Sequence, residues 1–221
     1  MANKETYFTA DNIAAKAVSM LDKLDLSGGN SFDFNYEPSA SALIILDLQH
    51  YFLNEVSHAF IPSSIAILDN IKSLIEQYKK KKLPVIFTRH INSRENAGLM
   101  SLWWNDIIEE DNHLSQLLQG LADNNDLVIN KTQYDAFYNT HLETILKERN
   151  ISQLVITGVM THLCCETTVR SAFVRGFKVF FPVDATATYN EKYHQSTLNN
   201  LSHGFTSPLL VSKIVSRLEE N

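Results

Sequence analysis

The stretch ALIIL at residues 42–46 decides the fold, because it is the first of six short, continuous apolar runs along the chain. Strands that are apolar on both faces belong to parallel sheets covered by helices on each side. The other five runs are residues 84–88, 126–129, 153–157, 178–182 and 207–211. Helical patterns separate the runs. The sequence therefore predicts an α/β fold, a three-layer sandwich with a six-stranded parallel sheet.

Apolar residues spaced three and four apart predict the helices between these strands. The clearest pattern covers residues 63–82, where Ile67, Ile71 and Leu74 share one face. Three more helices are expected at residues 140–149, 164–175 and 191–203, and Ser212 is expected to cap a last one.

The chain before residue 41 has a different character. Ile13, Ala17 and Met20 have the spacing of one amphipathic helix. Residues 27–40 are rich in Gly, Ser, Asn and Asp, which is typical of a connecting loop. Its aromatic side chains are expected to dock on the main body; they are Phe32, Phe34 and Tyr36. Residues 1–40 are thus predicted to be a helical extension and loop, and residues 41–221 to be the main domain.

Composition excludes several classes of function. The chain has 221 residues, of which 44% are hydrophobic, and a net charge of -6, which would not attract nucleic acid or an anionic membrane. No window approaches the 18 or so uninterrupted apolar residues of a membrane span. The N-terminus lacks the pattern of a secretory signal, and two adjacent cysteines cannot form a disulfide framework. We therefore expect a cytoplasmic protein.

Chemically active residues follow four of the predicted strands. Asp47 follows the first, Arg89 and His90 the second, Lys131 the third, and Cys164 comes a short turn after the fourth. Ligands of open parallel sheets bind beyond the carboxyl ends of the strands, so these side chains are expected to converge.

A thiol, an ammonium and a carboxylate can together perform nucleophilic catalysis. Cys164 would attack as a thiolate, Lys131 would lower the thiol pKa through its charge, and Asp47 would accept the proton and return it to the leaving group. The backbone N–H groups of Met160 and Cys164 would face the oxygen of a tetrahedral intermediate.

These residues also carry a family resemblance. The sequence Asp-Leu-Gln from Asp47, the position of Lys131 before the YDAF motif at residues 134–137, and the GVMT motif at residues 158–161 ahead of Cys164 resemble the isochorismatase-like family of cysteine hydrolases. The resemblance covers about residues 40–215. It implies an Asp-Lys-Cys catalytic triad, a cis peptide bond between Val159 and Met160, and a homodimer or homotetramer.

The chain differs from two subfamilies of this family, and these differences narrow the expected reaction and the expected cofactors. Isochorismatases carry Gly where this chain has Cys164, because vinyl ether hydrolysis needs an acid and a water but no thiolate. Nicotinamidases of the family bind a metal through an Asp-x-His pair after the second strand, where this chain has Arg89, His90, Ile91 and Asn92. We therefore expect no catalytic metal and no cofactor.

Other residues are candidates for lining a substrate pocket, because the long loop after residue 89 is of the kind that covers active sites. The candidates are Gln49, Phe52, Arg89, His90, Trp103, Tyr134, Phe137 and His162, with Trp104 beside them. Trp103 and Trp104 could equally anchor a subunit contact. Cys165, one residue further round the helix than Cys164, is expected to point into the core.

The sequence favours a hydrolase that cleaves a C–N bond of a small amide-like molecule through a thioester. Two alternatives stay open. One is an isochorismatase-type vinyl ether hydrolase in which Cys164 is a bystander, and the other is a binding protein without enzymatic activity on the same fold. A separation of more than about 8 Å between Asp47, Lys131 and Cys164 would favour the last, since proton transfer needs near hydrogen-bond reach.

Overall fold

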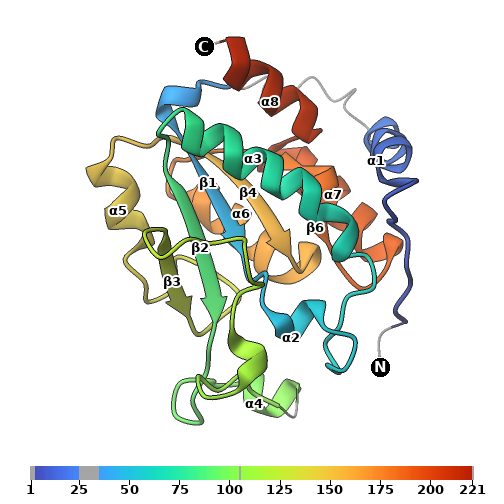
Figure 1. The fold of residues 1–221 in the computed structure, drawn as a ribbon, viewed down its shortest axis with the longest axis vertical. Coiled ribbons are helices and arrows are strands. Elements are labelled where there is room, and N and C mark those ends of the chain that lie inside the picture. Colours follow the sequence, from blue (N-terminus) through green and yellow to red (C-terminus); the bar gives the residue numbers. More distant parts are fainter. Residues whose placement is uncertain (1–2, 25–34, 105, 221) are drawn as a thin grey trace.

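The computed structural model describes residues 3–24, 35–104 and 106–220. A sheet of seven strands in the order β3-β2-β1-β4-β5-β7 lies at its centre, with the short β6 paired to β4, and every paired strand is parallel (Figure 1). The strands are β1 Ser41–Leu46, β2 Val85–His90, β3 Leu127–Lys131, β4 Gln153–Val159, β5 Lys178–Pro182, β6 Thr186–Ala187 and β7 Ser207–Leu209. The six predicted strands are therefore all present, and the two-residue β6 is additional.

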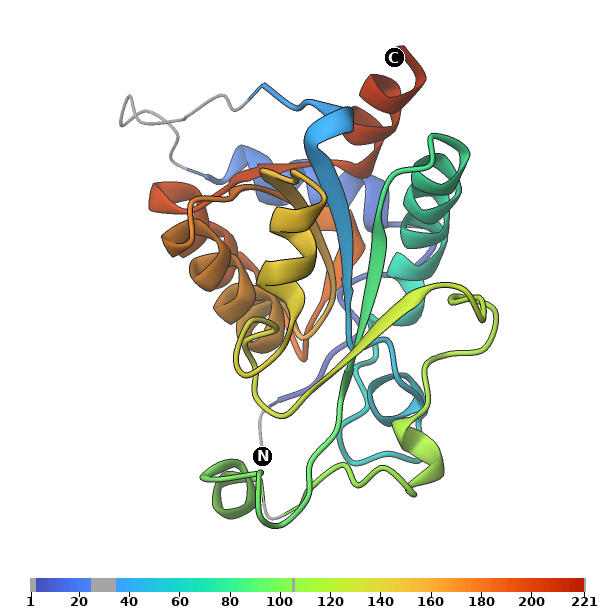
Figure 2. The same ribbon diagram turned by 90° about the vertical axis from the view of Figure 1, so that its left-hand side faces the viewer.

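Helices cover both faces of the sheet, so the three-layer prediction is confirmed. Figures 1 and 2 show α3 and α8 on one face and α6 and α7 on the other. The helices of the described residues are α1 Ile13–Asp22, α2 His50–Leu53, α3 Leu68–Lys80, α4 Met100–Trp103, α5 Leu142–Glu148, α6 Glu166–Val174, α7 Glu191–Gly204 and α8 Val211–Glu220. None of them is both long and apolar enough to cross a membrane.

Three predicted helices begin differently from the expectation. The pattern at residues 63–82 gives a 3₁₀ turn at Ile65–Ile67, and α3 begins only at Leu68. Residues 164–175 do not form one α-helix, because a π-helical turn occupies Thr161–Cys165 and α6 begins at Glu166. The expectation that Ser212 caps the last helix was wrong. Helix α8 already begins at Val211, whose N–H donates to Oδ1 of Asp184 at 2.9 Å, so a carboxylate from a distant loop takes that N–H.

The N-terminal segment crosses two distant parts of the chain before α1. The N–H of Glu5 donates to the carbonyl of Tyr189 at 2.8 Å, and the N–H groups of Tyr7 and Phe8 both donate to Oγ of Ser63 at 3.0 Å. The Tyr7 hydroxyl accepts from the N–H of Thr188 at 2.9 Å. This segment therefore joins the chain around residue 63 to the chain around residue 189.

The loop before β1 can be followed only in part. Tyr36 is buried, its hydroxyl lies 2.7 Å from that of Tyr78, and its ring packs edge-on against Phe180. Tyr36 therefore docks on the main body as expected, whereas Phe32 and Phe34 lie outside the described residues. The division of the chain at residue 40 into an extension and a domain stays a prediction.

Gly158 allows β1 and β4 to approach closely at the end that bears the chemically active residues. It pairs with Leu46 and has a φ of 105°, and a Cβ at this position would lie 2.1 Å from the Leu46 carbonyl oxygen. No other residue type fits without moving a strand, because the obstruction is backbone.

Candidate active site

Three loop and strand ends bring Asp47, Lys131 and Cys164 together. Asp47 follows β1, Lys131 is the last residue of β3, and Cys164 lies in the π-helical turn after β4. Lys131 Nζ is 2.8 Å from Asp47 Oδ2 and 3.4 Å from Cys164 Sγ. The side chains of Asp47 and Lys131 are fully buried. Lys131 thus contacts both other groups, and the ligand atoms of Asp47 and Cys164 lie within 4.8 Å of each other.

The backbone and one hydroxyl fix the direction of the Asp47 carboxylate. Asp47 has a φ of 53°, in the left-handed region, which turns the chain sharply as it leaves β1. Thr88, in the interior of β2, donates its hydroxyl to Asp47 Oδ1 at 2.6 Å. Oδ2 is left to face Lys131.

Four acceptors surround the three protons of the Lys131 ammonium. Besides Asp47 and Cys164 they are the Gln133 carbonyl at 2.9 Å and His90 Nδ1 at 3.2 Å. Burial lowers the pKa of Lys131, but the Asp47 carboxylate and the hydrogen bonds to Asp47 and Cys164 more than offset this, so the pKa lies above its usual value. The charged ammonium is therefore favoured.

His90 is held as a neutral ring beside this cation. Burial, with the Lys131 charge as a further cause, lowers the pKa of His90 to about 4. Its Nε2 lies 2.8 Å from Asn92 Oδ1, which can only accept, so Nε2 carries the proton and Nδ1 accepts from Lys131.

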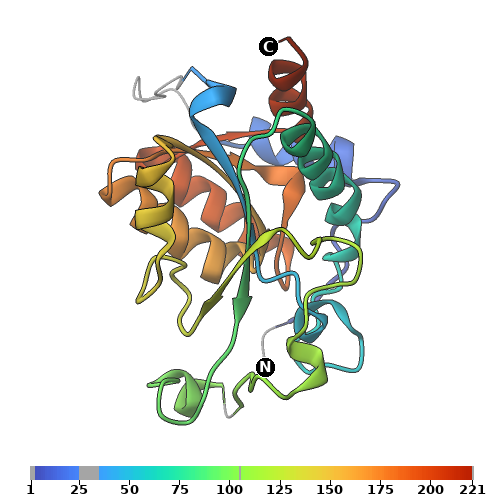
Figure 3. The same ribbon diagram turned by 60° about the vertical axis from the view of Figure 1, so that its left-hand side comes forward.

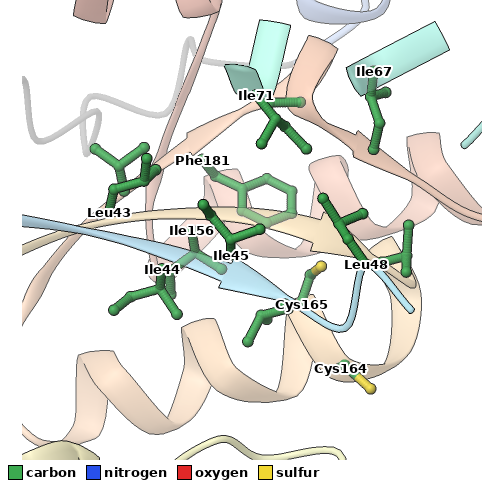
Figure 4. Close-up of a cluster of buried hydrophobic side chains, with 14 of the residues drawn as sticks. Leu43, Ile44, Ile45, Leu48, Ile67, Ile71, Ile156, Cys164, Cys165 and Phe181 are labelled. Carbon is green, nitrogen blue, oxygen red and sulfur yellow. The ribbon is translucent and has the colours of Figure 1, made fainter. Parts of the chain in front are cut away.

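The two cysteines point to different surroundings. Cys165 is fully buried, and Figure 4 shows its sulfur directed into the apolar cluster near Leu48, whereas the sulfur of Cys164 points away from that cluster. Cys165 is thus a core residue, as expected. Burial raises the pKa of Cys164 to about 12; Lys131 lowers it and Asp47 raises it. The neutral thiol is therefore favoured, because burial outweighs the lysine charge.

The turn between β4 and Cys164 has the backbone that the resemblance implies. The peptide bond between Val159 and Met160 is cis. The Met160 carbonyl accepts the N–H groups of Leu163 and Cys165, which closes the turn. Met160 and Cys164 both line the pocket described next. Their role as an oxyanion hole stays a prediction.

A cavity of about 550 Å³, including the space at its open side, lies over Cys164. Figures 1 and 3 place α2 and α4 at the carboxyl ends of the strands, and both helices contribute to its wall. Its lining is chiefly aromatic and aliphatic: Tyr51, Phe52, Ala59, Met100, Trp104, Ile107, Ile108, Tyr134, Met160, Leu163 and Tyr189, with His58, His90, Asn92, Asp106 and Cys164 as the polar and thiol groups. This composition is typical of a small-molecule site.

Of the eight candidates for pocket lining, Phe52, His90 and Tyr134 line this cavity, and Tyr134 accepts a hydrogen bond from Trp104 Nε1 at 2.7 Å. Gln49 does not. Its fully buried amide bonds to both the N–H and the carbonyl of His90 and to the carbonyl of Ser115, so it joins the end of β2 to a neighbouring loop.

The other four candidates also lie outside the cavity lining. Arg89 donates to Ser115, and Trp103 is 78% exposed on α4. Phe137 stacks on the Phe177 ring, and His162 stacks on Tyr193 while bonding to Thr188.

Several residues of the site were not found by sequence reasoning, namely Thr88, Tyr51, His58, Asp106 and Tyr189. A signal existed for Tyr51, which follows Gln49 by two residues beyond the first strand. None existed for His58 and Asp106, which come from separate loops.

The surroundings of Lys131 do not fit a metal ion. Asp47, His90 and Cys164 offer ligand atoms within 4.8 Å of one another. However, Lys131 Nζ lies within 3.4 Å of an atom of each of the three. An ammonium already occupies the place between these ligands, and a second cation there would be strongly repelled.

Comparisons with known proteins agree with one another. The isochorismatase domain model matches residues 41–212. The chain is 40% identical to Nicotinamidase 3 of Arabidopsis thaliana over 172 residues, 75% of this chain and 82% of that one. It is 33% identical to Enterobactin synthase component B of Escherichia coli K12, of which the match spans 60%. A cysteine hydrolase from Pseudomonas syringae has the same fold, with a TM-score of 0.80 at 24% identity over 84% of this chain and 95% of that one. The chain belongs to the isochorismatase-like family of cysteine hydrolases.

Proposed function

We propose that this protein hydrolyses a C–N bond in a small amide through a thioester on Cys164. The contact of Lys131 with both Asp47 and Cys164 is the observation that carries the proposal. Two relatives support amide chemistry by name, Nicotinamidase 3 and, at 26% identity, the N-carbamoylsarcosine amidase of an Arthrobacter species.

The first half-reaction forms the thioester. Because the buried thiol is neutral, attack of Sγ on the amide carbonyl carbon is coupled to transfer of its proton to Asp47. Lys131 balances the charge that moves between sulfur and carboxylate. The tetrahedral intermediate then collapses, the C–N bond breaks, and Asp47 returns the proton to the leaving nitrogen, which departs as ammonia or an amine.

The second half-reaction releases the acid. A water loses a proton to Asp47 and attacks the thioester carbon, and the C–S bond breaks. The proton of Asp47 returns to the sulfur, so the thiol is restored. One water is consumed for each amide cleaved, and no metal or organic cofactor takes part.

The test is a comparison of two neighbouring cysteines. Wild type, Cys164→Ala and Cys165→Ala are incubated with nicotinamide and other small amides and ureides, ammonia release is measured, and mass spectrometry detects any acyl group. We expect acylation at Cys164 and no turnover by Cys164→Ala, with activity kept in Cys165→Ala. Full activity in Cys164→Ala would refute the mechanism.

Isochorismate is assayed in the same series, because the Isochorismatase of Bacillus subtilis is 26% identical over 83% of this chain. Activity of Cys164→Gly on isochorismate would instead support the vinyl ether hydrolase. The expected cytoplasmic location and the dimer or tetramer stay predictions.

A further inference from the structure

Two polar residues of the cavity lining are far more exposed than Cys164, and together with Tyr51 they form a cluster of hydrogen-bonded side chains. Cys164 is 4% exposed, whereas the side chains of His58 and Asp106 are 56% and 45% exposed. Tyr51 lies beneath them and is buried. We call Tyr51, His58 and Asp106 the mouth cluster.

Hydrogen bonds hold the Asp106 carboxylate in one orientation. Its Oδ2 accepts from the Tyr51 hydroxyl at 2.6 Å and lies 3.4 Å from His58 Nδ1, while its Oδ1 accepts from the N–H of Ile107 at 2.9 Å. A carboxylate offers about four lone-pair sites, so acceptor capacity is left over. Asp106 can therefore receive a further donor from a ligand.

The charge of the cavity has one sign. Among the described residues that line it, Asp106 is the only Asp, Glu, Lys or Arg. The Lys131 ammonium is fully buried and engaged by Asp47 and the Gln133 carbonyl, so it has little capacity to pair with an anionic substituent. Lys4 donates to the carbonyl of His58 and lies over the Tyr189 ring, but it is not among the lining residues.

We propose that the mouth cluster selects the substrate, binding a cationic or N–H donor group at the end remote from the scissile amide. The body between the two ends would be flat and apolar, to match the aromatic walls. A carboxylate in the same position would be repelled by the like charge of Asp106, so anionic amides, and dicarboxylates such as isochorismate, would bind less tightly. The claim that the bound molecule is a substrate rests on the proposed function. The preference for a cationic or N–H donor group does not depend on it.

Binding to Cys164→Ala tests this without requiring turnover. Three probes that share a benzamide core are titrated by calorimetry or NMR: 3-(aminomethyl)benzamide, 3-carbamoylbenzoate and the unsubstituted benzamide. We expect the amine to bind more tightly than the carboxylate by about tenfold or more, as for hydrogen bonds to charged groups. Weaker or equal binding of the amine would overturn the proposal, and so would the absence of binding by all three probes at millimolar concentration.

Further substitutions in Cys164→Ala assign the preference to named residues. Adding Asp106→Asn should remove most of the difference between amine and carboxylate. Adding Tyr51→Phe, which loses the hydroxyl that orients Asp106, should reduce it by a smaller factor. Asp111→Asn makes the same charge change on an exposed residue outside the cavity and should leave the preference intact. An unchanged preference in the Asp106 variant, or an equal loss in the Asp111 variant, would overturn the assignment.

The two proposals fail in different ways. If Cys164 is acylated by neutral amides but the three probes bind alike, amide hydrolysis stands and the mouth cluster has no selective role. If the probes follow the expected order but no amide is cleaved or acylates Cys164, the binding site stands and the proposed reaction is wrong.

Discussion

The buried ion pair between Asp47 and Lys131 allows a quantitative test by a double-mutant cycle. The two side chains have no exposed surface, and their charged atoms are 2.8 Å apart. Removing one partner leaves the other charge buried without compensation, which costs about 3–5 kcal/mol. Lys131→Met should reach this range, because Asp47 would then keep only the Thr88 hydroxyl. Asp47→Asn should cost less, since Lys131 keeps the Gln133 carbonyl and His90.

The double variant should be more stable than the sum of the two losses predicts. With both charges gone no uncompensated ion remains, so we expect a coupling free energy of about 1–3 kcal/mol. Urea denaturation of wild type, both single variants and the double variant gives the four free energies of unfolding. The same cycle on the exposed pair of Lys147 and Glu143 serves as a control and should show a coupling of no more than about 0.5 kcal/mol. Additive losses at the buried pair would refute the reasoning.

Three further predictions concern stability. Gly158→Ala should prevent folding or cost more than about 4 kcal/mol, because the new Cβ meets the Leu46 carbonyl. The control Gly176→Ala, at a residue with a φ of 88° and open space around it, should cost only about 1–2 kcal/mol. Similar melting temperatures of the two variants would contradict this. Burial lowers the pKa of His194 to about 3, so below pH 6.5 the unfolded chain binds a proton that the folded chain does not. The free energy of unfolding should therefore fall by up to about 1.4 kcal/mol per pH unit as pH drops from 6.5 toward 3 on account of this residue, and His194→Gln should show a shallower slope in urea denaturation at pH 7, 6 and 5. Cys165→Ser should cost about 1–3 kcal/mol by leaving a hydroxyl without a partner in the core, and calorimetry should find Cys165→Ala more stable than Cys165→Ser.

The sheet and the convergence of Asp47, Lys131 and Cys164 could be predicted because each depends on a local signal. Continuous apolar runs mark buried parallel strands, and the rule that ligands bind beyond strand ends places the residues that follow them. Thr88 could not be recognised as the partner of Asp47, because a β-branched residue inside a strand is ordinary whether or not its hydroxyl is used.

The walls of the cavity could not be predicted for a different reason. His58 and Asp106 come from loops separated by a strand and two helices, and their meeting depends on loop conformations that have no sequence period. The π-helical turn at Thr161–Cys165 is likewise too short to leave a pattern, so the start of α6 was misplaced. Gln49 and Phe137 are near the site, but their side chains have structural roles. The Gln49 amide bonds to the backbone of His90 and Ser115, and the Phe137 ring stacks on that of Phe177.

The N-terminal segment has a consequence for the order in which the protein matures during synthesis. Glu5 and Tyr7 bond to Tyr189 and Thr188, more than 180 residues later in the chain. At about 5–20 residues per second, the ribosome needs roughly 10–40 s to supply those partners. During that interval Glu5 and Tyr7 lack their hydrogen-bond partners at Tyr189 and Thr188. The Tyr189 wall of the cavity therefore reaches its final position only near the end of translation, so a nascent chain can have most of its sheet and still lack a finished pocket.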